Sequence, residues 1–211
     1  MTHTLHRQGT VENLKEDYVL LLRTSRWVNH EGSERKMQQI WEVISHYEQD
    51  IVNFGNHYPN WGGGKLYDME ALKKAKSRII HVVFKDREKL QACLKEIKES
   101  EFGISAVVSA LCSETQKICS EIGLSPHTVN YSLGIHGKTD RVPEGEVLEI
   151  HTMCGHAMAS SHLIDHMVAE IRKGKITCEA AAGKLAGMCD CGIFNTYRAE
   201  KLLRKMTSPH P

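Results

Sequence analysis

The stretch RIIHVVFKDREKLQACLKEIKESEFGISAVVSAL, residues 78–111, decides the fold. Residues 79–84 form a short apolar run broken only by a histidine, which is typical of a buried strand. Asp86 can cap the helix that follows, because apolar residues then recur every three or four positions. A second apolar run at 104–111 comes after the helical pattern. The stretch therefore predicts a strand–helix–strand unit.

The same alternation extends on both sides of this unit. Upstream, the sequence predicts a strand at 17–24, a helix at 33–47, a short strand at 51–54 and a loop at 56–65, whose Tyr58 and Trp61 could line a ligand mouth. Downstream, it predicts a helix at 113–122 and strands at 127–135 and 147–150. Two such units predict an α/β (α+β) fold, a ferredoxin-like βαββαβ layer extended by a further helix and strand. A doubly wound sheet is the alternative.

After about residue 151 the composition changes to short helices separated by glycine, cysteine and histidine. Helices are expected at 161–173, at 177–187 and after Asn195, with no long linker before them. We therefore expect an α/β sandwich domain at 1–150 and a small helical, Cys/His-rich metal-binding subdomain at 151–211 packed on it.

The overall composition is that of an ordinary globular protein. Of 211 residues, 41% are hydrophobic and 25% are charged, and 27 basic against 26 acidic residues give a net charge of +1. This balance disfavours nucleic acid and anionic membranes as partners. The polar N-terminal segment has no export-signal pattern, so we expect a cytoplasmic protein. The expected partners are a small-molecule substrate or effector and, where a sheet edge is open, a second copy in a homodimer.

The seven cysteines are unusual for such a chain. An odd number without an export signal favours free thiols or metal ligands over disulfides. Cys154, Cys189 and Cys191 lie at predicted helix junctions, where unpaired backbone N–H groups and the helix dipole stabilise thiolates. Cys178 would stand about 16 Å from Cys189 along a helix and is excluded from the same centre. The other three are expected within or beside helices, as small hydrophobes: Cys93, Cys112 and Cys119.

Three thiolates from two loops fit two kinds of centre. A [4Fe–4S] cluster held by Cys154, Cys189 and Cys191 would leave one iron open to water, a substrate or His156. Zinc (Zn²⁺) would take the three cysteines and His156 as a closed Cys₃His tetrahedron. The short Cys-x-Cys spacing is less typical of structural zinc, which favours the cluster. Loop cysteines without a metal are the third possibility.

The preferred functional hypothesis is an iron–sulfur lyase or hydro-lyase. Its open iron would act as a Lewis acid on a small anionic substrate, while His156 or His151 transfers the proton. Arg198 could clamp the anionic group. The alternative is a structural or sensory zinc site beside a small-molecule-binding α/β domain, without catalysis. Electron transfer by the cluster also stays open.

Overall fold

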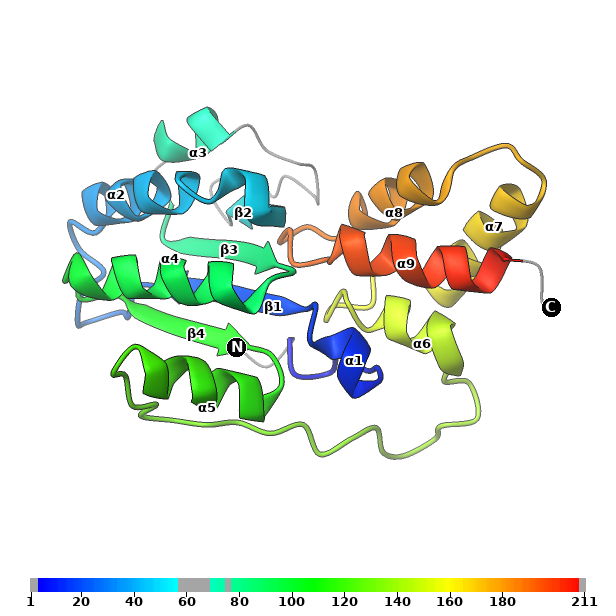
Figure 1. Ribbon diagram of the computed structural model, residues 1–211, viewed down its shortest axis with the longest axis horizontal. Coiled ribbons are helices and arrows are strands. Elements are labelled where there is room, and N and C mark those ends of the chain that lie inside the picture. The colour runs from blue at the N-terminus through cyan, green and yellow to red at the C-terminus, as the bar shows by residue number, and fades with distance from the viewer. Residues whose placement is uncertain (1–3, 57–68, 75–76, 209–211) are drawn as a thin grey trace.

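The computed structural model describes residues 4–56, 69–74 and 77–208. Over these residues the protein is an α+β structure with one four-stranded antiparallel sheet and nine α-helices (Figure 1). The strands are β1 (Tyr18–Arg23), β2 (Ile51–Asn56), β3 (Ile79–Phe84) and β4 (Ser105–Ser109), in the order β2-β3-β1-β4.

The helices divide into two groups around this sheet. They are α1 (Val11–Leu14), α2 (Glu34–Ser45), α3 (Met69–Lys74), α4 (Arg87–Glu99), α5 (Cys112–Glu121), α6 (Gly145–His151), α7 (Ser161–Arg172), α8 (Cys178–Ala186) and α9 (Thr196–Thr207), with a 3₁₀ turn at Glu48–Asp50. α2 joins β1 to β2 and α4 joins β3 to β4, whereas α6 to α9 gather at one end of the sheet (Figure 1). None of the helices in the described ranges has the length and apolar character needed to cross a membrane.

One face of the sheet forms a core with α2 and α4. Alternate residues of β1, including Leu20 and Leu22, share this face with Ile80 and Val82 of β3, because side chains alternate along a strand. Trp41 of α2 is fully buried against them. In both helices the apolar positions recur every three or four residues. This spacing correctly predicts which face of each helix packs on the sheet.

The opposite face of the sheet belongs to a second core. Val19 and Val83 join the buried side chains of α6 to α9 there. β1 is thus buried on both faces, which explains its unbroken apolar sequence. Ile150 of α6 also lies in this core, so α6 packs with the C-terminal helices, and a boundary at residue 150 would cut its last turn.

Two expected strands are wrong. Residues 127–135 form no strand, since 125–141 run extended and exposed without a β-sheet partner. Residues 147–150 lie within α6, where the short apolar run serves one helical face; a run of this length does not distinguish strand from helix. The predicted loop at 56–65 lies, apart from Asn56, outside the described residues.

A buried ion network ties the sheet to the C-terminal helices. Asp17, just before β1, is fully buried and accepts hydrogen bonds from Arg7 (2.6 Å), Arg198 (2.9 Å) and Asn195 (3.1 Å). Burial alone would raise the pKa of Asp17, but the two guanidinium groups and Asn195 lower it below its ordinary value. Arg7 also donates to the carbonyl of Ile193, so the network joins residues 7–17 to residues 193–198, at the opposite end of the chain.

We expect Asp17→Asn to destabilise the protein by about 3–5 kcal/mol, because two buried guanidinium groups would lose their shared counter-charge. Urea unfolding at pH 7 measures the change. Glu16→Gln is the matched control: it removes the exposed Lys201–Glu16 pair and should cost at most about 1 kcal/mol. Equal losses in the two variants would contradict the role given to Asp17.

The lowered pKa of Asp17 also predicts how the stability difference between wild type and Asp17→Asn depends on pH. Because the folded pKa of Asp17 is lowered, its stabilising contribution is present above the unfolded value of about 3.9 and is lost as the pH falls through the folded value. The stability difference between wild type and Asp17→Asn should therefore stay constant above about pH 5 and shrink below about pH 4. A difference that does not change over that range would count against a charged Asp17.

Candidate metal centre

The loop between α8 and α9 carries two of the predicted ligands and is pressed onto the sheet. Gly192 has a φ of +68°, and a Cβ there would lie 2.4 Å from the carbonyl oxygen of Phe54. A Cβ on Gly55 of β2 would likewise lie 2.9 Å from the carbonyl oxygen of Cys191. His81 Nδ1 donates to that same carbonyl at 2.9 Å. Close backbone contacts that only glycine permits therefore fix the loop on β2, and the hydrogen bond from His81 fixes it on β3.

The third cysteine lies in a turn between α6 and α7. His151, the last residue of α6, donates from Nδ1 to the carbonyl of Ala159 at 2.8 Å, which closes the turn. Inside it, the backbone N–H groups of His156 and Met158 donate to the Cys154 sulfur and lower its pKa. His151 thus has a positioning role on the turn that carries Cys154.

The fold brings the three predicted cysteine ligands together. Cys154, Cys189 and Cys191 are 1%, 0% and 3% exposed, and the Cys189 side chain hydrogen-bonds with both of the others. His156 Nδ1 lies 3.7 Å from the Cys191 sulfur, and the His156 side chain is exposed. We call these four residues the thiol centre; it is buried on the cysteine side and opens to solvent at His156.

The thiols perturb one another's ionisation. The pKa of Cys154 is raised by its hydrogen bond with Cys189 and by burial. The hydrogen bond with Cys154 lowers the pKa of Cys189, but Cys191 and burial outweigh it and raise the value to about 11. The hydrogen bond with Cys189 lowers the pKa of Cys191. The largest causes of these shifts are the neighbouring thiols, burial and backbone N–H groups, and no lysine or arginine is among them.

The side chains as they stand are hydrogen-bonded thiols. Among residues 4–56, 69–74 and 77–208, no three His, Cys, Asp or Glu side chains are grouped closely enough to hold one metal ion.

Arg198 lies elsewhere. It is fully buried, and its Nε donates to Asn13, its Nη1 to Asp17 and its Nη2 to the carbonyl of Gln8 and to Glu149. Each guanidinium nitrogen therefore already has an oxygen partner inside the protein. In the structure Arg198 belongs to the Asp17 network, and this leaves the predicted anion clamp without support from its geometry.

The remaining cysteines stand apart from the centre. Cys178 begins α8 and contacts Thr207 at 3.8 Å. Cys93 is buried in α4, and Cys112 and Cys119 lie in α5. Sequence reasoning missed His81, although a histidine inside an otherwise apolar strand was a detectable signal that its polar atoms need a partner.

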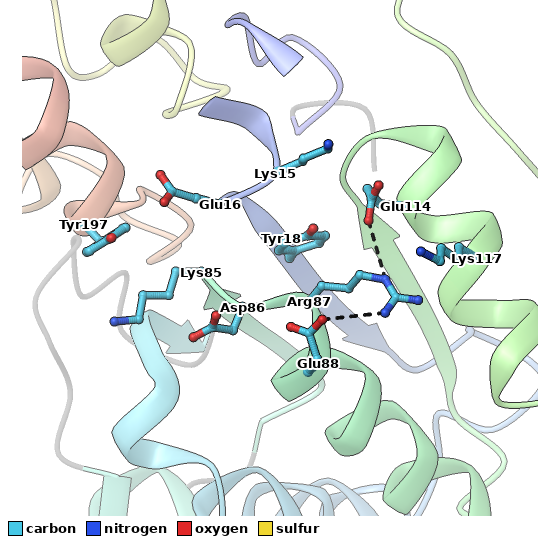
Figure 2. Close-up of a pocket in the computed structure, with 10 residues that line it drawn as sticks. All are labelled: Lys15, Glu16, Tyr18, Lys85, Asp86, Arg87, Glu88, Glu114, Lys117 and Tyr197. Atoms are coloured by element: carbon cyan, nitrogen blue, oxygen red, sulfur yellow. Dashed lines mark ion pairs between the residues drawn. The ribbon is translucent and has the colours of Figure 1, made fainter. Parts of the chain in front are cut away.

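A surface pocket of about 530 Å³ lies beside Tyr18, on the face of the sheet opposite to His81. Figure 2 shows the lining side chains around Tyr18; they are Lys15, Glu16, Lys85, Asp86, Arg87, Glu88, Glu114, Lys117 and Tyr197. Arg87 pairs with Glu88 and Glu114, whereas Lys15 and Lys117 make no ion pair with the described residues. Tyr18 is 1% exposed, and its hydroxyl has no hydrogen-bond partner among the described residues. Burial, together with Glu114, raises its pKa to about 12, so it stays a hydrogen-bond donor.

We expect Gly192→Ala to displace the loop that carries Cys191 and to destabilise the protein, because the new Cβ would meet a backbone carbonyl. Gly174→Ala is the matched control, since Gly174 has a φ of +70° but open space around it; it should cost only the backbone strain of about 1–2 kcal/mol. Urea unfolding compares the two. Equal costs would mean that contact with β2 does not hold the loop.

Comparisons with protein-family models, with curated proteins and with solved structures give no match to this chain. The function proposed for the thiol centre therefore depends on the chemistry and geometry of its own residues.

Proposed function

We propose that the protein is an iron–sulfur protein whose [4Fe–4S] cluster is held by Cys154, Cys189 and Cys191. The observation that carries this proposal is the meeting of three buried thiols from two segments 35 residues apart. Buried thiolates need a compensating positive charge, and a metal centre supplies it where the protein offers none.

The surroundings of the sulfurs fit such a group. Backbone N–H groups of His156 and Met158 donate to Cys154, and that of Ile193 donates to Cys189 and Cys191. Hydrogen bonds of this kind stabilise sulfur ligands and tune iron–sulfur clusters. A cluster also binds one thiolate at each iron, so the sulfurs need not converge on a single ion, as zinc would require.

The proposed chemistry is that of a lyase or hydro-lyase acting on a small anionic substrate. When bound, the cluster would supply a Lewis-acidic iron without a cysteine ligand. His156, exposed at the open side of the thiol centre, would transfer the proton or ligate, and His151 would hold the Cys154 turn through Ala159. We leave Arg198 out of the substrate site because the Asp17 network occupies it.

We also propose the ferredoxin-like description for the layer from β1 to β4. The order β1-α2-β2-β3-α4-β4 along the chain, with α3 inserted before β3, and the antiparallel order β2-β3-β1-β4 across the sheet support it. The thiol centre would then sit where the C-terminal helices meet β2 and β3 of this layer.

The test is the iron, zinc and acid-labile sulfide content of protein purified without oxygen, together with its visible spectrum. We expect about four irons and four sulfides per chain and absorption near 400 nm. Cys154→Ser, Cys189→Ser and Cys191→Ser should each lose most of both. Cys178→Ser, another buried thiol, is the matched control and should keep them. A Cys189→Ser variant with full metal content would refute the proposed site.

The pocket beside Tyr18 favours a second candidate function, in which the metal is structural zinc and the α/β layer binds a small effector. Lys15 and Lys117, which make no ion pair with the described residues, and the Tyr18 hydroxyl could bind an anion there, although Glu16, Asp86, Glu88 and Glu114 also line the pocket. About one zinc per chain without sulfide would select this candidate.

For this candidate, we expect inorganic phosphate to raise the melting temperature of the wild type above that in chloride of equal ionic strength. Tyr18→Phe keeps the ring but removes the hydroxyl, and Lys117→Gln removes a cation; each should reduce the phosphate effect. Lys175→Gln, which alters a lysine paired with Glu170 far from the pocket, is the control. An equal phosphate effect in all four proteins would exclude the pocket.

A further inference from the structure

Residues 125–141, here called the arm, leave the body of the protein. Every one of them is exposed, and they join α5 to α6 as an extended trace along one side of the molecule (Figure 1). Within the arm, which is described throughout, the only backbone N–H that donates a hydrogen bond is that of Gly134, to the Ser132 hydroxyl. The chain itself therefore gives the arm almost no backbone partners.

The sequence of the arm is that of a half-buried strand. Val129, Tyr131, Leu133 and Ile135 alternate with small or polar residues, yet they are 48%, 59%, 84% and 40% exposed. Apolar residues at every second position indicate a strand whose apolar side packs against another surface. The described residues of the chain do not supply that surface.

A complementary patch lies around β4. Trp27, Val28 and Val107, here called the acceptor patch, are 85%, 81% and 38% exposed. Asn29 donates to the carbonyl of Gly103, which ties the turn that carries Trp27 to the start of β4. Trp27 has a φ of +71°, a conformation that residues other than glycine rarely adopt. The arm and the acceptor patch together account for seven of the ten exposed large hydrophobic side chains among the described residues.

The two edges of the sheet differ in a way that points to β4. The β2 edge has a register shift, and Thr196 and Asn53 make hydrogen bonds between β2 and the start of α9. Among the described strands β4 pairs with β1 alone, and its sequence Ser-Ala-Val-Val-Ser contains no charge or proline that would block another strand. Its last residue, Ser109, hydrogen-bonds with Thr4 of the N-terminal segment. Residues 127–135 also contain no Lys, Arg, Asp or Glu, so no charge opposes their pairing with β4.

We propose that the arm of one copy adds to the β4 edge of a second copy and buries its apolar side on the acceptor patch, in a two-fold exchange. Each copy would donate one arm and receive one, as an isologous dimer requires. The arm and β4 together offer about 22 residues per copy, within the 20–30 per side of a stable interface. The second copy is the favoured partner because this chain carries both complementary surfaces.

The first test is the mass of the full chain in solution, by light scattering after size exclusion. We expect about twice the 23.8 kDa of one chain for the wild type and a single-chain mass for Leu133→Asp, with unchanged circular dichroism. Asn130→Asp adds the same charge at an alternate position, on the other side of the arm, and should stay dimeric. A monomeric wild type would overturn the proposal and indicate that the arm pairs with its own β4 or with another protein, and a dimeric Leu133→Asp would also overturn it.

Mixing two variants tests the exchange itself. Val107→Lys should also be monomeric, because it puts a charge into the acceptor patch. A mixture of Leu133→Asp and Val107→Lys should form dimers again, since the intact arm of one variant meets the intact acceptor patch of the other. A mixture that stays monomeric at the highest concentration reached would overturn the arm-to-acceptor pairing. The outcome is independent of the metal content, so it is separate from the proposed function.

Discussion

The buried carboxylate of Asp17 is the interaction on which the arrangement of the two cores depends. A carboxylate removed from water is unfavourable unless it is paired and hydrogen-bonded, and Asp17 meets this condition only where Arg7 and Arg198 reach it together. Arg7 holds the N-terminal segment and, through the carbonyl of Ile193, the residues before α9 next to Asp17. Arg198 holds α9 there. One charge requirement thus sets the C-terminal helices against the start of β1 and places the loop of the thiol centre.

The buried sulfurs of the thiol centre are stabilised differently from the Asp17 carboxylate. At Asp17 every buried charge has an opposite charge within the protein, whereas at Cys154, Cys189 and Cys191 the largest influences on the pKa values are the other thiols, burial and backbone N–H groups. Backbone N–H groups stabilise one thiolate but do not neutralise three. The raised pKa values of Cys154 and Cys189 favour their thiol forms in the free protein, and the proposed cationic centre would complement the full set of sulfurs.

The sequence correctly predicted those helices and strands that depend on local features, namely the spacing of apolar residues and the helix caps. The strands at 79–84 and 104–111, the helix between them and the three C-terminal helices follow from periodicity and caps. The buried state of Arg198 was beyond reach, because it requires Asp17, 181 residues away in the sequence. The alternation at 127–135 is typical of a strand, but no strand among the described residues pairs with it, so the predicted strand is wrong.

The loop of Cys189 and Cys191 and the turn of Cys154 are not held equally tightly in the fold. Gly192 and Gly55 press the loop of Cys189 and Cys191 onto β2 at backbone-to-backbone distance, and His81 holds its carbonyl from β3. The turn of Cys154 has one side-chain closure, from His151 to Ala159, and its residues 155–158 lie at or near the surface. Because the loop has no free space beside it, the turn is the half that would move when the sulfurs adjust to a metal centre.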